Sequence, residues 1–213
     1  MKRHFKIIRF ALFVIFGFLS CNESGKQDNR PNFVFILIDD LGWKDLGFMG
    51  SEYYETPHID HLAKNGMIFT QAYANAANCA PTRACLLSGQ YTPRHGVYTV
   101  GKSDRGNPED RRLIPTKNNL TVPLEKVFIS EMLKTAGYKS AVFGKWHVGN
   151  TPAEQGFDFE NQGSDFNGHF NEKGEYLADY LTNQAVEFIK ENNPGKTGFP
   201  FFLYLAHMPF IRP

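Results

Sequence analysis

A short segment that begins at Cys79 carries the side chains best suited to covalent chemistry. It reads Cys-Ala-Pro-Thr-Arg-Ala-Cys-Leu-Leu-Ser-Gly, and Pro81 followed by good helix formers predicts a helix that starts close to Cys79. A thiol there would lie near the unpaired N–H groups of a helix N-terminus, which favour an anion or a nucleophile. Arg83 would lie one turn further along the same face. Taken alone, Cys79 could equally be a buried structural cysteine or the disulfide partner of Cys85.

Two adjacent carboxylates, Asp39 and Asp40, follow a continuous apolar run at residues 32–38. That run is rich in aromatic and β-branched residues, which predicts a central strand of a parallel sheet, covered on both faces. Two neighbouring carboxylates repel each other unless a cation or hydrogen-bond donors neutralise them. Their hard oxygens suit Ca²⁺ or Mg²⁺ better than zinc. The alternative is that one Asp caps the next turn while the other is solvated.

Two further apolar runs are followed by basic side chains. After the first run, Lys145 and His147 would point to one side of an extended chain, with Trp146 on the other. An ammonium beside an imidazole forms an anion site, and histidine exchanges protons near neutral pH. After the second run comes His207, which taken alone would more often be structural. The two runs are residues 140–143 and 199–205.

Helical patterns alternate with these runs, so we predict an α/β fold with a mostly parallel central sheet flanked by helices. The carboxyl ends of parallel strands meet at one edge, where ligands bind. We therefore expect the polar side chains after the three strands to converge there with the start of the Cys79 helix. Besides that helix, we expect helices at residues 56–66, 123–137 and 177–189, and a short strand at residues 67–73.

Two polar stretches predict loops. Residues 101–119 predict an exposed loop, and residues 156–176 are rich in Gly and Asn, with a hairpin turn expected at Asn167-Gly168. Basic side chains of the first loop could contact an anionic substrate or simply be solvated. These side chains are Lys102, Arg105, Arg111 and Arg112.

These motifs together resemble the sulfatase family. Its signature is a Cys or Ser followed by Pro, Arg and Leu-Ser/Thr-Gly at the spacing seen from Cys79 to Gly89. The segment that opens with Asp39-Asp40 and the segment Gly144-Lys145-Trp146-His147 match the same family. The resemblance covers nearly all of residues 31–213, and it implies an alkaline-phosphatase/sulfatase-like fold.

The resemblance implies an arylsulfatase-like sulfuric ester hydrolase. A maturation enzyme would convert Cys79 to formylglycine, whose aldehyde hydrate attacks sulfur and later expels sulfate by C–O cleavage. Ca²⁺, with Mg²⁺ less favoured, would be held by Asp39, Asp40 and the modified Cys79.

The resemblance also assigns roles to the basic residues. Arg83 and Lys145 would stabilise the hydrate and the developing negative charge. His147 is the candidate base for the collapse step, and His207 is the candidate acid for the leaving alcohol.

The resemblance reaches only the first part of a sulfatase. Sulfatases continue with an Asp-Asn pair that completes the metal site, another Lys on the sulfate, further core strands and a small C-terminal domain. We therefore expect residues 31–213 to be an incomplete catalytic domain, from a fragment or truncated product that need not be active by itself.

Residues 1–20 have the pattern of an export signal. A basic start precedes an apolar run that is too short to span a membrane, and Ser20 precedes Cys21. This resembles a bacterial lipoprotein signal, with cleavage before Cys21 and acylation of its sulfur, and the alternative is an ordinary secretory signal. Residues 21–30 then form a flexible tether. We expect an exported protein, periplasmic or at the outer membrane or cell surface of a bacterium, held to the membrane by its lipid anchor alone.

Composition limits the partners. Residues 1–20 hold four of the 23 Lys and Arg and no acidic residue, so the 22 Asp and Glu of residues 21–213 exceed the basic residues by three. No basic surplus remains to suggest nucleic-acid binding. Three cysteines are too few for a disulfide scaffold. The expected partner is a sulfated carbohydrate or aryl sulfate.

Two other functions stay open from the sequence. A phosphodiesterase or phosphonate hydrolase of the same superfamily would use a similar metal and anion pocket. A non-catalytic, truncated lipoprotein would instead bind sulfated glycans through its basic groups.

Overall fold

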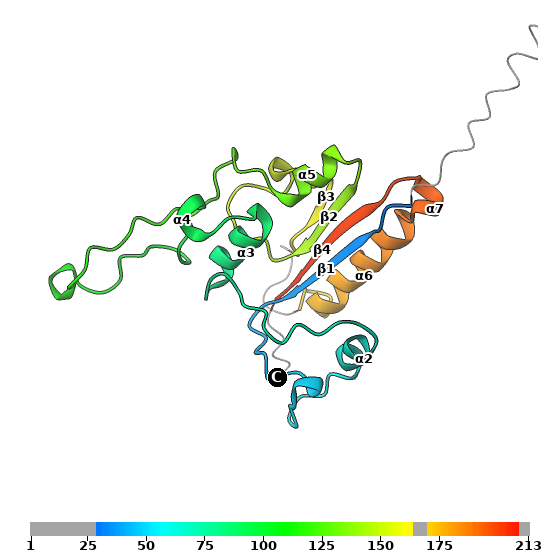
Figure 1. Ribbon diagram of the computed structural model, residues 1–213, viewed down its shortest axis with the longest axis horizontal. Helices are drawn as coiled ribbons and strands as arrows, with labels where there is room; N and C mark the ends of the chain where they lie inside the picture. Colours follow the sequence, from blue (N-terminus) through cyan, green and yellow to red (C-terminus); the bar gives the residue numbers. More distant parts are fainter. Residues whose placement is uncertain (1–28, 164–169, 209–213) are drawn as a thin grey trace, which may run out of the picture.

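The computed structural model describes residues 29–163 and 170–208 (Figure 1). The expected signal, Cys21 and the expected turn at Asn167-Gly168 lie outside the described residues. None of the helices in the described part of the chain has the length and apolar character that a membrane span needs.

The centre of the fold is a four-stranded sheet in the order β1-β4-β2-β3. Every neighbouring pair is parallel, so all four carboxyl ends lie at one edge. This confirms the α/β class that the sequence predicts. The strands are β1 (Phe33–Ile38), β2 (Lys139–Gly144), β3 (Phe159–Asn161) and β4 (Phe201–His207).

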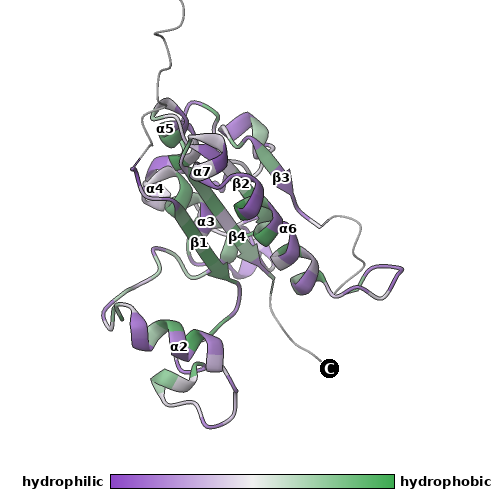
Figure 2. Cartoon of the chain, turned by 90° about the vertical axis from the view of Figure 1, so that its right-hand side faces the viewer, coloured by the Kyte–Doolittle hydropathy of each residue, from purple (hydrophilic) through white to green (hydrophobic). Residues whose placement is uncertain are grey.

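Helices cover both faces of the sheet. On one face, α6 (Leu177–Glu191) packs Leu181 against Leu203 of β4. On the other face, α3 (Cys79–Ser88) and α5 (Ile129–Thr135) lie over residues such as Tyr204. Side chains of β4 alternate between the two clusters, as the period of a strand requires. Figure 2 shows the resulting concentration of hydrophobic residues in β1, β4 and β2.

Short elements connect these layers. Two of them, α4 (Thr92–His95) and α7 (Pro194–Thr197), are single helical turns after α3 and before β4. The 3-10 helices are η1 (Gly47–Met49), η2 (Pro108–Asp110) and η3 (Ala153–Gln155).

The helix α2 (Pro57–Asn65) confirms the signals for its two ends. Thr56 is the N-cap residue, Pro57 is the first helical residue and Gly66 follows the last turn. The Thr56 hydroxyl accepts a hydrogen bond from the Gly47 N–H at 2.8 Å, which fixes η1 against the helix. Its histidines, at positions 58 and 61, are exposed.

The position of β1 corrects the sequence analysis. Residues 32–38 predict a central strand, but β1 lies at the edge of the sheet and β4 occupies the centre. Phe33, Val34 and Ile36 are 45–52% exposed, whereas every residue of β4 is buried. An apolar run indicates that a strand can be buried on both faces, but it does not say which neighbours the rest of the chain provides.

Three local predictions were also wrong. Residues 67–73 form no strand, and Met67, Phe69 and Tyr73 are 73–80% exposed. The helix expected from Pro123 begins only at Ile129, because the chain first makes a turn whose end is fixed by the fully buried Phe128. The short strand β3 was missed, since its three residues carry no clear alternating pattern.

The exposure of β1 predicts a large difference between two matched substitutions. Leu203→Ala should lower the free energy of unfolding by about 3 kcal/mol, because Leu203 is fully buried. Ile36→Ala should cost less than about 1 kcal/mol, because half of Ile36 is exposed. Urea unfolding followed by circular dichroism measures both, and equal losses would contradict the edge position of β1.

Candidate active site at the carboxyl edge of the sheet

The carboxyl end of β4 positions the groups that follow β1 and β2. The Asp39 N–H donates to the His207 carbonyl at 3.2 Å, and the Lys145 N–H donates to the Ala206 carbonyl at 2.9 Å. Because β4 lies between β1 and β2, its last residues hold both neighbouring segments. The structure therefore brings together the segments that follow the first two predicted strands and the end of the third.

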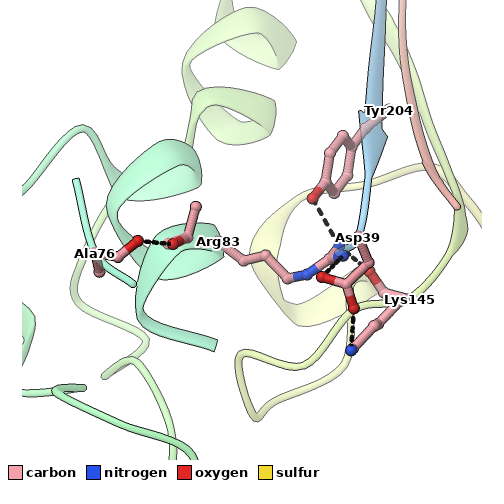
Figure 3. A network of polar contacts seen from close by, with 6 residues as sticks. Asp39, Ala76, Arg83, Lys145 and Tyr204 are labelled. Atoms are coloured by element: carbon pink, nitrogen blue, oxygen red, sulfur yellow. Dashed lines mark hydrogen bonds and ion pairs between the residues drawn. The ribbon is translucent and has the colours of Figure 1, made fainter. Parts of the chain in front are cut away.

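Arg83 reaches into this edge from α3 (Figure 3). Its side chain is fully buried, and Nη1 donates to the Lys145 carbonyl at 2.6 Å and to the Tyr204 hydroxyl at 3.0 Å. Its Nη2 lies 3.4 Å from the Asp39 carboxylate. Within the residues the structure describes, the Arg83 Nε has no hydrogen-bond partner. The guanidinium thus joins the helix that begins at Cys79 to β4 and to the segments that follow β1 and β2.

Asp39 is the negative centre of this group. Its carboxylate pairs with the Lys145 ammonium on one oxygen and with Arg83 on the other. Burial raises the pKa of Asp39, but the two cations outweigh burial and hold that pKa below its ordinary value. The carboxylate is therefore ionised near neutral pH, and together the three side chains carry one net positive charge.

Cys79 is the first residue of α3, and Asn78 is its N-cap residue, as the Pro81 position suggests. The Cys79 side chain is half-buried and its thiol is free. A disulfide with Cys85 is excluded, since six residues of helix separate the two along the axis by about 9 Å. The buried Cys85 instead contacts His95, with 3.3 Å between Sγ and Nε2.

The two candidate histidines lie at the same edge in different surroundings. His147 is exposed and adopts a left-handed backbone with φ of 60°, so the segment after β2 is not extended there. Desolvation of its imidazole lowers the pKa of His147, and the charges of Lys145 and Arg83 lower it further. Burial lowers the pKa of His207. Both rings are therefore neutral at pH 7. Trp146 packs in the core.

The four basic residues singled out in the loop at 101–119 have different surroundings. Arg111 is used inside the loop, where its guanidinium donates to the carbonyls of Arg105 and Gly106. Lys102 instead lines a cavity at the base of the loop. Arg105 and Arg112 are exposed.

Sequence reasoning missed two residues of the site. Tyr204 supplies the hydroxyl that accepts a hydrogen bond from Arg83. The sequence could have indicated this residue, because a tyrosine hydroxyl within the apolar run at residues 199–205 needs a hydrogen-bond partner when it is buried. Asn78 precedes the cysteine, and its amide donates to the Thr99 hydroxyl at 3.0 Å. This contact links the cysteine helix to the loop after α4, which no pattern in the sequence indicates.

The described residues do not by themselves fit a Ca²⁺ ion. Asp39 and the exposed Asp40 offer the right hard oxygens, but Ca²⁺ takes six to eight oxygen ligands. Asp39 is already paired with two cations, and residues 29–163 and 170–208 contain no group of three or more metal-binding side chains. Cys79 is not grouped with the two carboxylates either.

The fold and the site together define an α/β protein in which a helix that begins with a cysteine brings a buried arginine to the cationic group at the carboxyl edge of a parallel sheet. A family model described as Sulfatase matches residues 31–209. The chain belongs to the sulfatase family.

Individual relatives agree with this assignment. A protein of Formosa agariphila named sulfatase is 43% identical in an alignment that covers 70% of this chain and 28% of that protein. The N-acetylgalactosamine-6-sulfatase of Canis lupus familiaris is 31% identical, with 83% of this chain and 39% of that protein covered. The crystal structure of Ps i-CgsB in complex with k-i-k-neocarrahexaose has a TM-score of 0.68 and 31% identity, and the match covers 86% of this chain and 46% of that one. The chain thus spans less than two fifths of the length of these two curated relatives.

The ion pairs of Asp39 predict a strong asymmetry between the two adjacent aspartates. Asp39→Asn should lower the free energy of unfolding by about 3 kcal/mol, because it leaves the buried Arg83 without its counter-charge. Asp40→Asn should cost less than about 0.5 kcal/mol, because Asp40 is exposed and Asn tolerates its φ of 55°. Urea unfolding of both variants measures this difference, and similar losses would be evidence against the buried ion-pair group.

The donor set also predicts weak metal binding by this chain. Titration calorimetry with CaCl₂ should give no saturable binding below about 1 mM, because too few oxygen ligands lie together. A micromolar Kd that Asp39→Asn abolishes would show that the chain forms a complete site.

Proposed function

We propose that this chain carries the nucleophile and anion-binding part of a sulfuric ester hydrolase that acts on sulfated carbohydrates. The observation that carries the proposal is the convergence of the Cys79 helix start with Arg83 and Lys145, in a chain of the sulfatase family. The names of the relatives support a carbohydrate substrate, since one is an N-acetylgalactosamine-6-sulfatase and another was crystallised with a neocarrahexaose.

In this proposal the chain's own residues bind the sulfate and move protons. The Lys145 side chain is 23% exposed, so its ammonium can contact both Asp39 and an incoming anion. Arg83, fully buried, orients the Lys145 backbone and keeps the site positive. His147, neutral at pH 7 because its pKa is lowered, accepts a proton near the Cys79 position. His207 serves the leaving alcohol as a proton donor once it is protonated.

Two groups that the structure does not contain belong to the proposal. Formylglycine at Cys79, made by a maturation enzyme, would supply the hydroxyl nucleophile, and the free, half-buried thiol at a helix start is compatible with that modification. Ca²⁺ at Asp39, Asp40 and the modified Cys79 is proposed from their chemistry alone, and it requires further ligands. No step here depends on the metal.

The cellular setting is proposed from the N-terminal sequence. Export, acylation of Cys21 and attachment to a bacterial envelope would bring the site to sulfated polysaccharides outside the cell. The experiment below is designed to distinguish this function from two alternatives. One is a phosphodiesterase or phosphonate hydrolase, and the other is a non-catalytic glycan-binding protein.

Hydrolysis by matured protein tests the proposal. The full-length natural polypeptide that carries these residues is co-expressed with a formylglycine-generating enzyme and assayed on 4-nitrophenyl sulfate and 4-nitrophenyl phosphate. The sulfate ester should be cleaved faster, and Cys79→Ala should lower its kcat by at least about 1,000-fold, because the nucleophile is lost.

Cys85→Ala is the matched control, since Cys85 is buried against His95 and away from the edge of the sheet. This variant should keep the sulfate activity of the wild type. Faster cleavage of the phosphate ester would favour a phosphodiesterase. Equal turnover with and without Cys79 would contradict the proposed nucleophile, and binding without any turnover would favour the non-catalytic alternative.

A further inference from the structure

The loop between α4 and Val122 projects from the body of the molecule and is fixed at its base (Figure 1). Asn118 makes this attachment, because its Oδ1 accepts from the N–H groups of Tyr98 and Thr99 at 2.6 and 3.1 Å. Its Nδ2 donates to the carbonyls of Thr99 and Gly101 at 3.0 and 2.5 Å. One amide thus satisfies four backbone groups and holds the two arms of the loop together.

The base of this loop is connected to the cysteine helix. Asn78, the N-cap residue of α3, donates to the Thr99 hydroxyl, and the Thr99 backbone is held by Asn118. Asn119 adds a second attachment, since its Nδ2 donates to the His95 carbonyl at 3.1 Å. Side chains at the loop base therefore keep a fixed position relative to the start of α3.

A cavity of about 360 Å³ opens at this base, with two lysines on its wall. Lys102 comes from the outgoing arm and Lys117 from the returning arm, so the Asn118 attachment also fixes their separation. The hydroxyl of Ser103 and the apolar surfaces of Pro115 and Leu120 complete much of the lining. Hydroxyl, ammonium and apolar groups together are suited to a sugar ring that carries an anion.

The charge of the loop supports an anionic ligand. Residues 101–119 contain five basic and three acidic residues, whereas residues 21–213 as a whole have an acidic excess. Among the described residues that line the cavity, Asp104 supplies one carboxylate against two ammonium groups. An anion entering the cavity would therefore meet net positive charge on a chain that otherwise repels it.

We propose that the cavity between Lys102 and Lys117 is a subsite for a second sulfated sugar residue of a carbohydrate chain, next to the residue whose ester is cleaved. This inference rests on the proposed function, and it adds that the protein selects chains with more than one sulfate. Lys102 and Lys117 bind the second sulfate and take no part in the chemistry at Cys79.

Binding by a Cys79→Ala variant of the full-length natural polypeptide tests the subsite without turnover. The probes are chondroitin 6-sulfate and ι-carrageenan hexasaccharides and their desulfated counterparts, measured by titration calorimetry. At least one sulfated probe should bind, and its desulfated counterpart should bind at least about tenfold more weakly. Desulfated chondroitin keeps its carboxylates, so equally tight binding of that probe would overturn the requirement for sulfate.

Substitution of the two lysines gives the direct test. Lys102→Gln with Lys117→Gln should raise the Kd for the sulfated probe by about tenfold or more, because two charge-assisted contacts are lost. Lys102→Arg with Lys117→Arg should keep most of the affinity. The control is Lys190→Gln with Lys196→Gln, which removes the same charge from α6 and α7 and should leave the Kd unchanged. Equal losses in the two Gln pairs, or no loss in either, would overturn the subsite, as would failure of both sulfated probes to bind.

Kinetics of the matured protein separate this inference from the proposed function. The Lys102 and Lys117 double Gln variant should show a higher KM for the sulfated hexasaccharide and unchanged kcat/KM for 4-nitrophenyl sulfate, which carries no second sulfate for the cavity to bind. An unchanged KM for the hexasaccharide would contradict the subsite alone. Absence of turnover on either substrate by the wild type would contradict the proposed function, while the binding assay would still decide the subsite.

Discussion

The ion pairs of Asp39 with Arg83 and Lys145 are the interaction on which the site depends. A fully buried guanidinium is tolerated only when its charge is balanced, and Asp39 supplies that charge from the end of β1. The same guanidinium fixes the backbone of Lys145 and the hydroxyl of Tyr204. Helix α3, which begins at Cys79, is thereby held against the ends of β1, β2 and β4. The group keeps one positive charge beside the helix start, so it is suited to an anionic substrate.

The β1 edge of the sheet is covered much less than its centre. The strand β4 is buried along its whole length between α6 on one face and α3 on the other, whereas β1 pairs with β4 as its only strand neighbour in the described part of the chain. Leu37 packs against the α3 cluster, and the rings of Phe33 and Phe35 contact tyrosines at the edge of that cluster while remaining exposed. The segment with α2 likewise exposes large apolar side chains, among them Leu62 and Met67. Stability of the described chain therefore resides in β2, β4 and the helices that cover them.

Much of this arrangement was predictable from the sequence, for identifiable reasons. Apolar runs that end abruptly in polar residues located the strands, and a parallel sheet must bring those ends together. Strand order was not predictable, because the run at residues 32–38 is as apolar as the one that became β4. Likewise, the partner of Arg83 at Tyr204 and the attachment of the loop by Asn118 depend on contacts between residues 17 to 121 positions apart. Local patterns carry no signal for such contacts. The left-handed conformation of His147 was equally hidden, because only the fold imposes it.

The mass of the peptide that contains Cys79, from protein expressed in its own host, tests the central claim most directly. If the edge of the sheet presents Cys79 as the nucleophile position of a sulfatase, this peptide should be about 18 Da lighter than its sequence requires, as expected for conversion of the thiol to an aldehyde. The peptide with Cys85, after cleavage between the two, should keep its calculated mass. An unmodified Cys79 thiol would contradict the account, because the remaining groups would then bind an anion without a nucleophile to attack it.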